Sequence, residues 1–225
     1  MSVIKQKEWN SKKPKWSKFS NYGLYKLKKG ESESDYHYHD CDEYFIVTEG
    51  KADLLLEDLK YEISPGDCVC ILKGGRHQII NVSEDLTLVW IYDELKAEKR
   101  KGHISYHKER EKREIILPVR IVKMGHWDEQ KPYWSRLTNY GIVNFPKGKV
   151  GMDYEHHDCH EYYFVTKGSL LVLIDKRQFK CEVGDVACIP KGNGHRILES
   201  FEDSTIIWLQ DELKGEKGEV ISTKI

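Results

Sequence analysis

The chain has 225 residues, of which 36 are Lys or Arg and 37 are Asp or Glu, so its formal net charge at pH 7 is -1. This balance, with a pI near 6.8, excludes a basic field for nucleic acid and a polybasic membrane patch, and small-molecule partners are expected instead. Residues 1–7 contain no apolar run, and the apolar runs elsewhere are only strand-sized. We therefore expect a cytoplasmic protein that does not enter a membrane.

The apolar segments are short and alternate with period 2. In the first half they cover residues 43–47, 52–56, 69–72, 78–81 and 86–92, separated by Gly, Pro and Asp turn signals. This pattern favours an all-β fold, either an antiparallel sandwich or a barrel. Residues 94–114 are different because they are dense in Lys, Arg and Glu, which is typical of a solvated helix with i,i+4 ion pairs or of a charged linker.

The sequence repeats itself with an offset of 118 residues. Val3 aligns with Ile121, and the match runs without a gap to the C-terminus, with about 40 of roughly 105 compared positions identical. Trp9 pairs with Trp127 in this alignment. An internal duplication is the simplest explanation, and it predicts a first domain over 1–107, a charged linker over 108–120 and a second domain over 121–225.

Two histidines and a glutamate form a candidate metal motif in the first half. His37 and His39 are two residues apart, and side chains at i and i+2 of a strand point to the same face. Glu43 and His77 are placed to complete the site. Imidazoles with one carboxylate suit a divalent transition metal such as Fe, Mn, Ni, Co or Zn.

These residues also carry a family resemblance. The pattern Gly30-x6-His37-x-His39-x3-Glu43-x6-Gly50, followed by Gly66-Asp67-x6-Gly74-x2-His77-x3-Asn81, resembles the two motifs of the cupin superfamily, and the second half repeats both. The chain thus resembles a bicupin. The resemblance implies two tandem jelly-roll (double-stranded β-helix) barrels, with a metal held in the first by His37, His39, Glu43 and His77.

The second half departs from the motif at its first ligand. Glu155 stands where His37 stands in the first half, so the corresponding set is Glu155, His157, Glu161 and His195. Two carboxylates and two imidazoles are a plausible site for Mn, Fe or Zn. Alternatively, Glu155 turns away and leaves three ligands, or it serves as an acid or base beside the metal.

Basic side chains flank the last histidine of each motif. Lys73 and Arg76 lie beside His77, while Lys191 and Arg196 lie beside His195. If they face the mouth of the barrel, they can clamp an anionic substrate such as a carboxylate; otherwise they are ordinary solvated loop charges.

Six cysteines lie at positions 41, 68, 70, 159, 181 and 188. In a chain of this size without an export signal we expect reduced thiols rather than disulfides. Cys41 and Cys159 recur inside the two candidate motifs. Each is either a turn residue held by packing or a thiol close to a metal.

The first functional hypothesis is a metal-dependent enzyme that acts on a small oxygen-rich metabolite, a carbohydrate, hydroxy acid or dicarbonyl, by dioxygenase- or isomerase-type chemistry. Decarboxylases also occur among cupin relatives, and the catalytic residues beyond the ligands stay unassigned. The alternative is a non-catalytic cupin module that binds a metal or a sugar. Association into a homo-oligomer is compatible with both.

Overall fold

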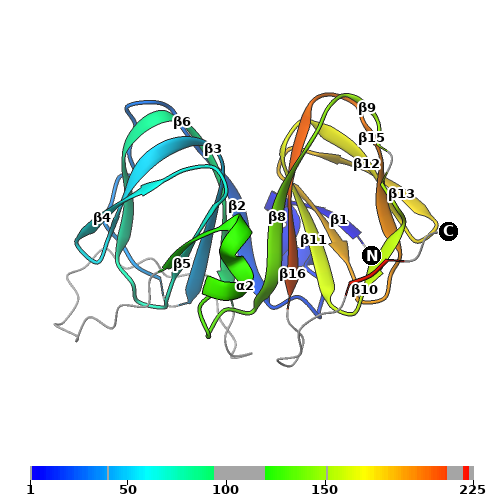
Figure 1. Cartoon of the computed structure of the whole chain (residues 1–225), viewed down its shortest axis with the longest axis horizontal. Coiled ribbons are helices and arrows are strands. Elements are labelled where there is room, and N and C mark those ends of the chain that lie inside the picture. Colours follow the sequence, from blue (N-terminus) through cyan, green and yellow to red (C-terminus); the bar gives the residue numbers. More distant parts are fainter. Residues whose placement is uncertain (1, 40, 94–119, 151, 212–219, 223–225) are drawn as a thin grey trace. The chain divides into compact units, whose positions relative to one another are not determined.

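The computed structural model of the chain describes residues 2–39, 41–93, 120–150, 152–211 and 220–222. They form two compact units (Figure 1), which we call the first barrel (residues 18–134) and the second barrel (residues 1–17 and 135–225). Except for Arg120, the predicted linker over 108–120 lies outside the described residues, as does the whole charged segment over 94–114. Within the described residues, no helix has the length and apolar character required to cross a membrane.

The first barrel is a six-stranded sheet with the order β2-β6-β3-β5-β7, and β4 pairs with β3 outside this path. Its elements are β2 (Phe19–Leu27), β3 (Asp42–Leu56), β4 (Leu59–Ile63), β5 (Asp67–Ile71), β6 (His77–Asp93), β7 (Arg120–Lys123), the 3-10 turn η2 (Met124–His126) and α2 (Trp127–Gln130). Alternate residues of β3, among them Ala52, Leu54 and Leu56, are buried in the barrel core. The period-2 pattern thus supplies the inward-facing apolar layer.

The second barrel contains two sheets, ordered β1-β14-β11-β16-β8 and β13-β12-β15-β10-β17, with β9 pairing with β15. Its elements are β1 (Ser2–Lys5), η1 (Gln6–Glu8), α1 (Trp9–Lys12), β8 (Leu137–Phe145), β9 (Gly148–Lys149), β10 (Glu155–His157), β11 (His160–Lys167), β12 (Ser169–Ile174), β13 (Arg177–Glu182), β14 (Asp185–Ile189), β15 (His195–Ser200), β16 (Ser204–Asp211) and β17 (Val220–Ser222). The all-β prediction is confirmed, and the repeat is visible as two barrels.

Segments that the sequence presents as separate strands are joined in the first barrel. Residues 43–47 and 52–56 belong to one bent strand, β3, and residues 78–81 and 86–92 belong to β6. The register between β3 and β6 shifts between Val47 and Asp53, so the bend is a series of bulges. Gly50 lies inside this bend with φ of 77°.

Gly50→Ala is expected to destabilise the first barrel strongly. A Cβ at this position would lie 2.1 Å from the backbone oxygen of Asp85. Gly30 is the matched control, because it also has positive φ but a Cβ added there would meet nothing within 4 Å. Gly30→Ala should lower the free energy of unfolding in urea by about 1 kcal/mol from φ strain alone, and Gly50→Ala by at least about 1 kcal/mol more. Equal losses would contradict the clash.

The two short N-terminal segments of the repeats are exchanged between the barrels. Strand β1 pairs antiparallel with β14 of the second barrel, from Ser2 opposite Cys188 to Lys5 opposite Asp185. Its repeat partner β7 pairs with β5 of the first barrel, where Val122 lies opposite Cys68. The compact units therefore differ from the predicted boundaries, because each segment completes the sheet of the repeat that does not follow it in sequence.

Candidate metal centres

Three histidines of the first barrel converge from two segments. His37 precedes β3 and pairs with His77, the first residue of β6; the backbone N–H of each donates to the carbonyl of the other. His39 lies two residues further on, and the three ring centroids are 4.5 to 5.2 Å apart. One ligand nitrogen from each ring lies within 4.8 Å of the others, which is a spacing suited to a single metal ion.

Glu43 brings a carboxylate to the same point. Its Oε2 atom lies 3.4 Å from Nε2 of His39 and 3.0 Å from Nε2 of His77. The side chain comes from the start of β3, and Glu43, His39 and His77 are each at most 3% exposed. The four side chains that the motif predicts in the first barrel thus lie together, with the three histidines as the set within 4.8 Å of one another and Glu43 in contact with two of them.

Hydrogen bonds to backbone carbonyls determine the tautomers of two histidines. Nδ1 of His37 lies 3.0 Å from the carbonyl oxygen of Asp35, and Nδ1 of His77 lies 3.0 Å from that of Gly75. A carbonyl oxygen can only accept, so each Nδ1 carries the proton and donates it. In the neutral rings, Nε2 is then a lone-pair donor directed at the cluster, as in metal-ligating histidines.

The buried atoms of the first site fit a cation. Nε2 of His77 and Oε2 of Glu43 are buried acceptors without a hydrogen-bond donor, although they lie 3.0 Å apart. Burial raises the pKa of Glu43. Although burial alone would lower it, the pKa of His77 is raised by the Glu43 carboxylate. The pair therefore needs a proton or a metal between the two atoms, and the nitrogen and oxygen donors suit a divalent transition metal.

The second barrel holds a three-ligand cluster. Oε2 of Glu161 lies 3.1 Å from Nε2 of His157 and 2.6 Å from Nε2 of His195. All three side chains are at most 4% exposed. Nδ1 of His195 donates to the carbonyl of Asn193, so its Nε2 is again directed at the cluster.

Glu155 lies next to this cluster rather than in it. It occupies β10 opposite His195, but it is not among the side chains whose ligand atoms lie within 4.8 Å of one another. Although burial alone would lower the pKa of His195, this pKa is raised mainly by Glu161, and the negative charge of Glu155 adds to the effect. The structure thus brings together three of the four predicted residues in the second barrel.

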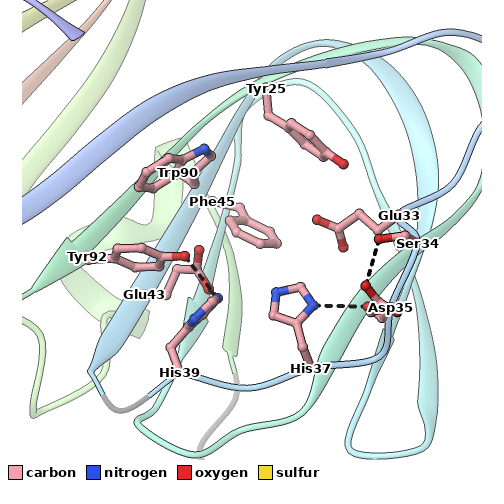
Figure 2. Close-up of a pocket in the computed structure, with 10 residues that line it drawn as sticks. All are labelled: Tyr25, Glu33, Ser34, Asp35, His37, His39, Glu43, Phe45, Trp90 and Tyr92. Atoms are coloured by element: carbon pink, nitrogen blue, oxygen red, sulfur yellow. Dashed lines mark hydrogen bonds and ion pairs between the residues drawn. The ribbon is translucent and has the colours of Figure 1, made fainter. Parts of the chain in front are cut away.

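A cavity of about 300 Å³ opens onto the first cluster. Figure 2 shows the side chains around it, which come from β2, β3, β6 and the segment before β3. The lining residues are Tyr25, Glu33, Ser34, Asp35, His37, His39, Glu43, Phe45, Trp90 and Tyr92. The hydroxyl of Tyr92 lies 3.0 Å from Nε2 of His39 and is therefore beside a candidate metal ligand.

Two positions of the second barrel that correspond to the cavity wall are more apolar. At the offset of 118 residues, Tyr25 corresponds to Val143 and Ser34 to Met152. Both Val143 and Met152 pack against the core cluster of the second barrel. The surroundings of the two similar ligand clusters therefore differ at these two positions, whereas Phe45 and Tyr92 correspond to the more polar Tyr163 and Gln210.

Several cavity residues were not predicted from the sequence, chiefly Tyr25, Glu33 and Tyr92. The available signal was the difference between the repeats, since these positions are Val143, Gly151 and Gln210 in the second half. Residues that differ in chemical type between the two copies of a duplicated barrel are candidates for the ligand cavity of one copy.

The basic residues proposed as an anion clamp do not line this cavity. Lys73 and Lys191 are exposed. The guanidinium of Arg76 lies 4.1 Å from the ring centroid of Tyr36, over its face. This stacked arrangement accounts for Arg76 without a ligand.

All six cysteines are buried, and none of them forms a disulfide. Cys159 is 4% exposed, and burial raises its pKa to about 12, with the Glu161 charge acting in the same direction. Its thiol is therefore protonated near neutral pH. Cys41 is 3% exposed.

Comparison with known families matches the cupin domain model twice, over residues 23–92 and 141–209. The chain belongs to the cupin family and carries two cupin domains. Uncharacterized protein y4oW of Sinorhizobium fredii is 37% identical over 73 residues, which are 32% of this chain and 34% of that protein. The chain thus matches about a third of the length of this relative.

Solved structures with the same fold are bicupins. Vicilin from hazelnut, Corylus avellana, superimposes with a TM-score of 0.69 at 12% identity, over 98% of this chain and 82% of vicilin. A deletion mutant of Bacillus subtilis oxalate decarboxylase gives a TM-score of 0.62 at 14% identity, over 89% of this chain and 70% of the enzyme. Another structure of that decarboxylase is described by its Mn(II) centres and has a TM-score of 0.60 at 15% identity, over 98% and 74%. At these identities the likeness establishes the fold alone.

Proposed function

We infer that the chain is a metal-dependent enzyme that acts on a small oxygen-rich metabolite in the first barrel. The observation that carries this inference is the pair of buried acceptors, Nε2 of His77 and Oε2 of Glu43, which face each other beside a cavity. His37, His39, Glu43 and His77 would hold the metal. When bound, a divalent metal supplies a Lewis acid that polarises a substrate oxygen.

The chain itself supplies the surroundings of the reacting group. Tyr92 places a hydroxyl beside His39. Burial raises the pKa of Tyr92 well above its usual value, with the charge of Glu43 adding to the effect, so its proton is retained for donation. Phe45 and Trp90 form apolar parts of the cavity lining. These groups orient a small ligand and limit its contact with water.

The second barrel is assigned a metal site with a different wall. His157, Glu161 and His195 form its ligand set, and Val143 and Met152 pack where the first barrel has Tyr25 and Ser34. A metal here would chiefly stabilise the fold, because binding to the native state adds to its free energy of unfolding. The second candidate function is a non-catalytic module that binds a metal or a sugar. The same cavity would serve this function if no substrate is turned over.

Elemental analysis of the purified chain, reloaded in turn with Mn, Fe, Co, Ni and Zn, tests this proposal. We expect about one ion per occupied barrel, and turnover of at least one diol, hydroxy acid or dicarbonyl that stops with chelator and returns with the metal. Finding no metal after reloading would contradict the site. Metal-dependent binding without turnover across the panel would select the binding module.

A further inference from the structure

The cavity of the first barrel carries an unusual charge pattern for a site that was expected to bind an anion. Three of its ten lining residues are acidic, namely Glu33, Asp35 and Glu43, and none is Lys or Arg. Glu43 is committed to the metal cluster. Asp35 is exposed and accepts a hydrogen bond from the hydroxyl of Ser34 at 2.8 Å. Of the three acidic residues, Glu33 is therefore the one that lies in the cavity wall without belonging to the metal cluster or being exposed.

Glu33 is held in place by its backbone and its side chain together. Its N–H donates to the carbonyl of Ile79 at 2.9 Å, while its Oε2 accepts from the N–H of Ile79 at 2.6 Å. Nε2 of Gln78 donates to the Glu33 carbonyl at 2.8 Å. These contacts fix the carboxyl group at the start of β6, where Figure 2 shows it directed into the cavity between Tyr25 and His37.

One carboxyl oxygen of Glu33 is left for a ligand. Oε2 is occupied by Ile79, and no described side chain donates to Oε1. Burial raises the pKa of Glu33 to about 7, and the charge of Glu43 acts in the same direction. A hydroxyl group can donate to the ionised form and accept from the protonated form. A ligand carboxylate would instead meet a like charge in the ionised form.

The opposite part of the lining is aromatic. Trp90 lies across the backbone of Gly23, where a Cβ would be 2.4 Å from the indole ring. Gly23 and Trp90 are opposite each other in the β2–β6 register, so the glycine permits this flat placement. Together with Phe45 and Tyr25, the indole offers an apolar wall to the C–H face of a ring or chain.

We propose that the first barrel selects a neutral polyhydroxylated ligand, such as a monosaccharide or polyol, and that Glu33 determines this specificity by hydrogen bonding a ligand hydroxyl. The proposal rests on the proposed metal site in the same barrel. Of the three substrate classes considered, namely carbohydrates, hydroxy acids and dicarbonyls, this proposal favours carbohydrates. Anionic analogues are disfavoured because the three lining carboxylates, when ionised, outweigh the charge of one divalent ion, and the lining supplies no side-chain cation.

The test pairs each neutral sugar with an acid of similar size: glucose with gluconate and glucuronate, and galactose with galacturonate. Dissociation constants are measured by calorimetry on the metal-loaded chain. We expect at least one neutral sugar to bind about tenfold more tightly than its acid. Glu33→Gln removes the charge and keeps the shape, so it should reduce this ratio by about tenfold. Glu62→Gln, at an exposed position of β4, is the control and should leave the ratio unchanged.

Metal content separates the two proposals. A chain that loads metal but binds the acids as tightly as the sugars, or binds no neutral sugar at millimolar concentration, overturns the specificity assignment and leaves the metal site intact. An unchanged ratio in Glu33→Gln, with native metal content and an unchanged circular dichroism spectrum, also overturns the role of Glu33. Failure to load metal in the parent chain contradicts the proposed function itself.

Discussion

Replacing His39 and His77 together with alanine is expected to empty the first barrel of metal. Both Nε2 atoms face Oε2 of Glu43, and two ligands are lost at once. The affinity of the first site should fall by at least about a hundredfold, since even residues behind a metal ligand contribute ten- to a hundredfold. Metal per chain by elemental analysis, and the ligand binding of the first barrel, should both fall.

The second barrel supplies a matched control. His157→Ala with His195→Ala removes the corresponding ligands there and should leave ligand binding in the first barrel unchanged. His126→Ala, an exposed histidine beside Glu129, should change neither site. Unchanged metal content in the first double variant, with retained β-sheet circular dichroism, would show that its ligands are wrongly assigned.

Trp9→Ala is expected to destabilise the second barrel, although Trp9 lies in the first repeat of the sequence. Its side chain is fully buried and belongs to the segment that packs with residues 135–225. Loss of a buried tryptophan costs about 3–5 kcal/mol. Hydrogen exchange should therefore accelerate in β14, the partner of β1, while β5 keeps its protection.

Trp127→Ala is the reciprocal control. Trp127 is 1% exposed and packs with residues 18–134, so its loss should accelerate exchange in β5 and leave β14 protected. If each substitution instead affected the barrel of its own repeat, with Trp9→Ala loosening β5, the exchange of the N-terminal segments would be refuted.

The ligand clusters followed from the sequence because metal ligation imposes a spacing. Side chains two apart on a strand share a face, and this alternation predicted that the imidazoles of His37 and His39 point the same way; in the structure both residues precede β3, and His37 forms an isolated bridge with His77. The residues that line the cavity could not be predicted from a spacing in the sequence. Tyr25, Glu33 and Tyr92 come from separate segments, and only the closure of the barrel brings them together.

The exchange of segments could not be predicted for a different physical reason. Residues around Trp9 and Trp127 are similar in sequence, and so are the strands β5 and β14 that receive them. Apolar and polar alternation determines which strands are complementary, but it does not distinguish between two chemically equivalent partners. The predicted boundaries at 107 and 121 assumed the sequentially adjacent partner, whereas the structure uses the other.

The repeating unit of the sequence and the compact unit of the structure therefore have different boundaries. They differ by the N-terminal segment of each repeat, which is residues 1–17 in the first repeat. A single repeat expressed alone would carry β1 with no β14 to receive it, and its own β5 would lack the strand that β7 provides. In a pair of such copies, the N-terminal strand of each copy could pair with the acceptor strand of the other. This exchange gives a symmetric homodimer. In the duplicated chain this exchange of strands is intramolecular. The completion of each sheet therefore does not depend on protein concentration.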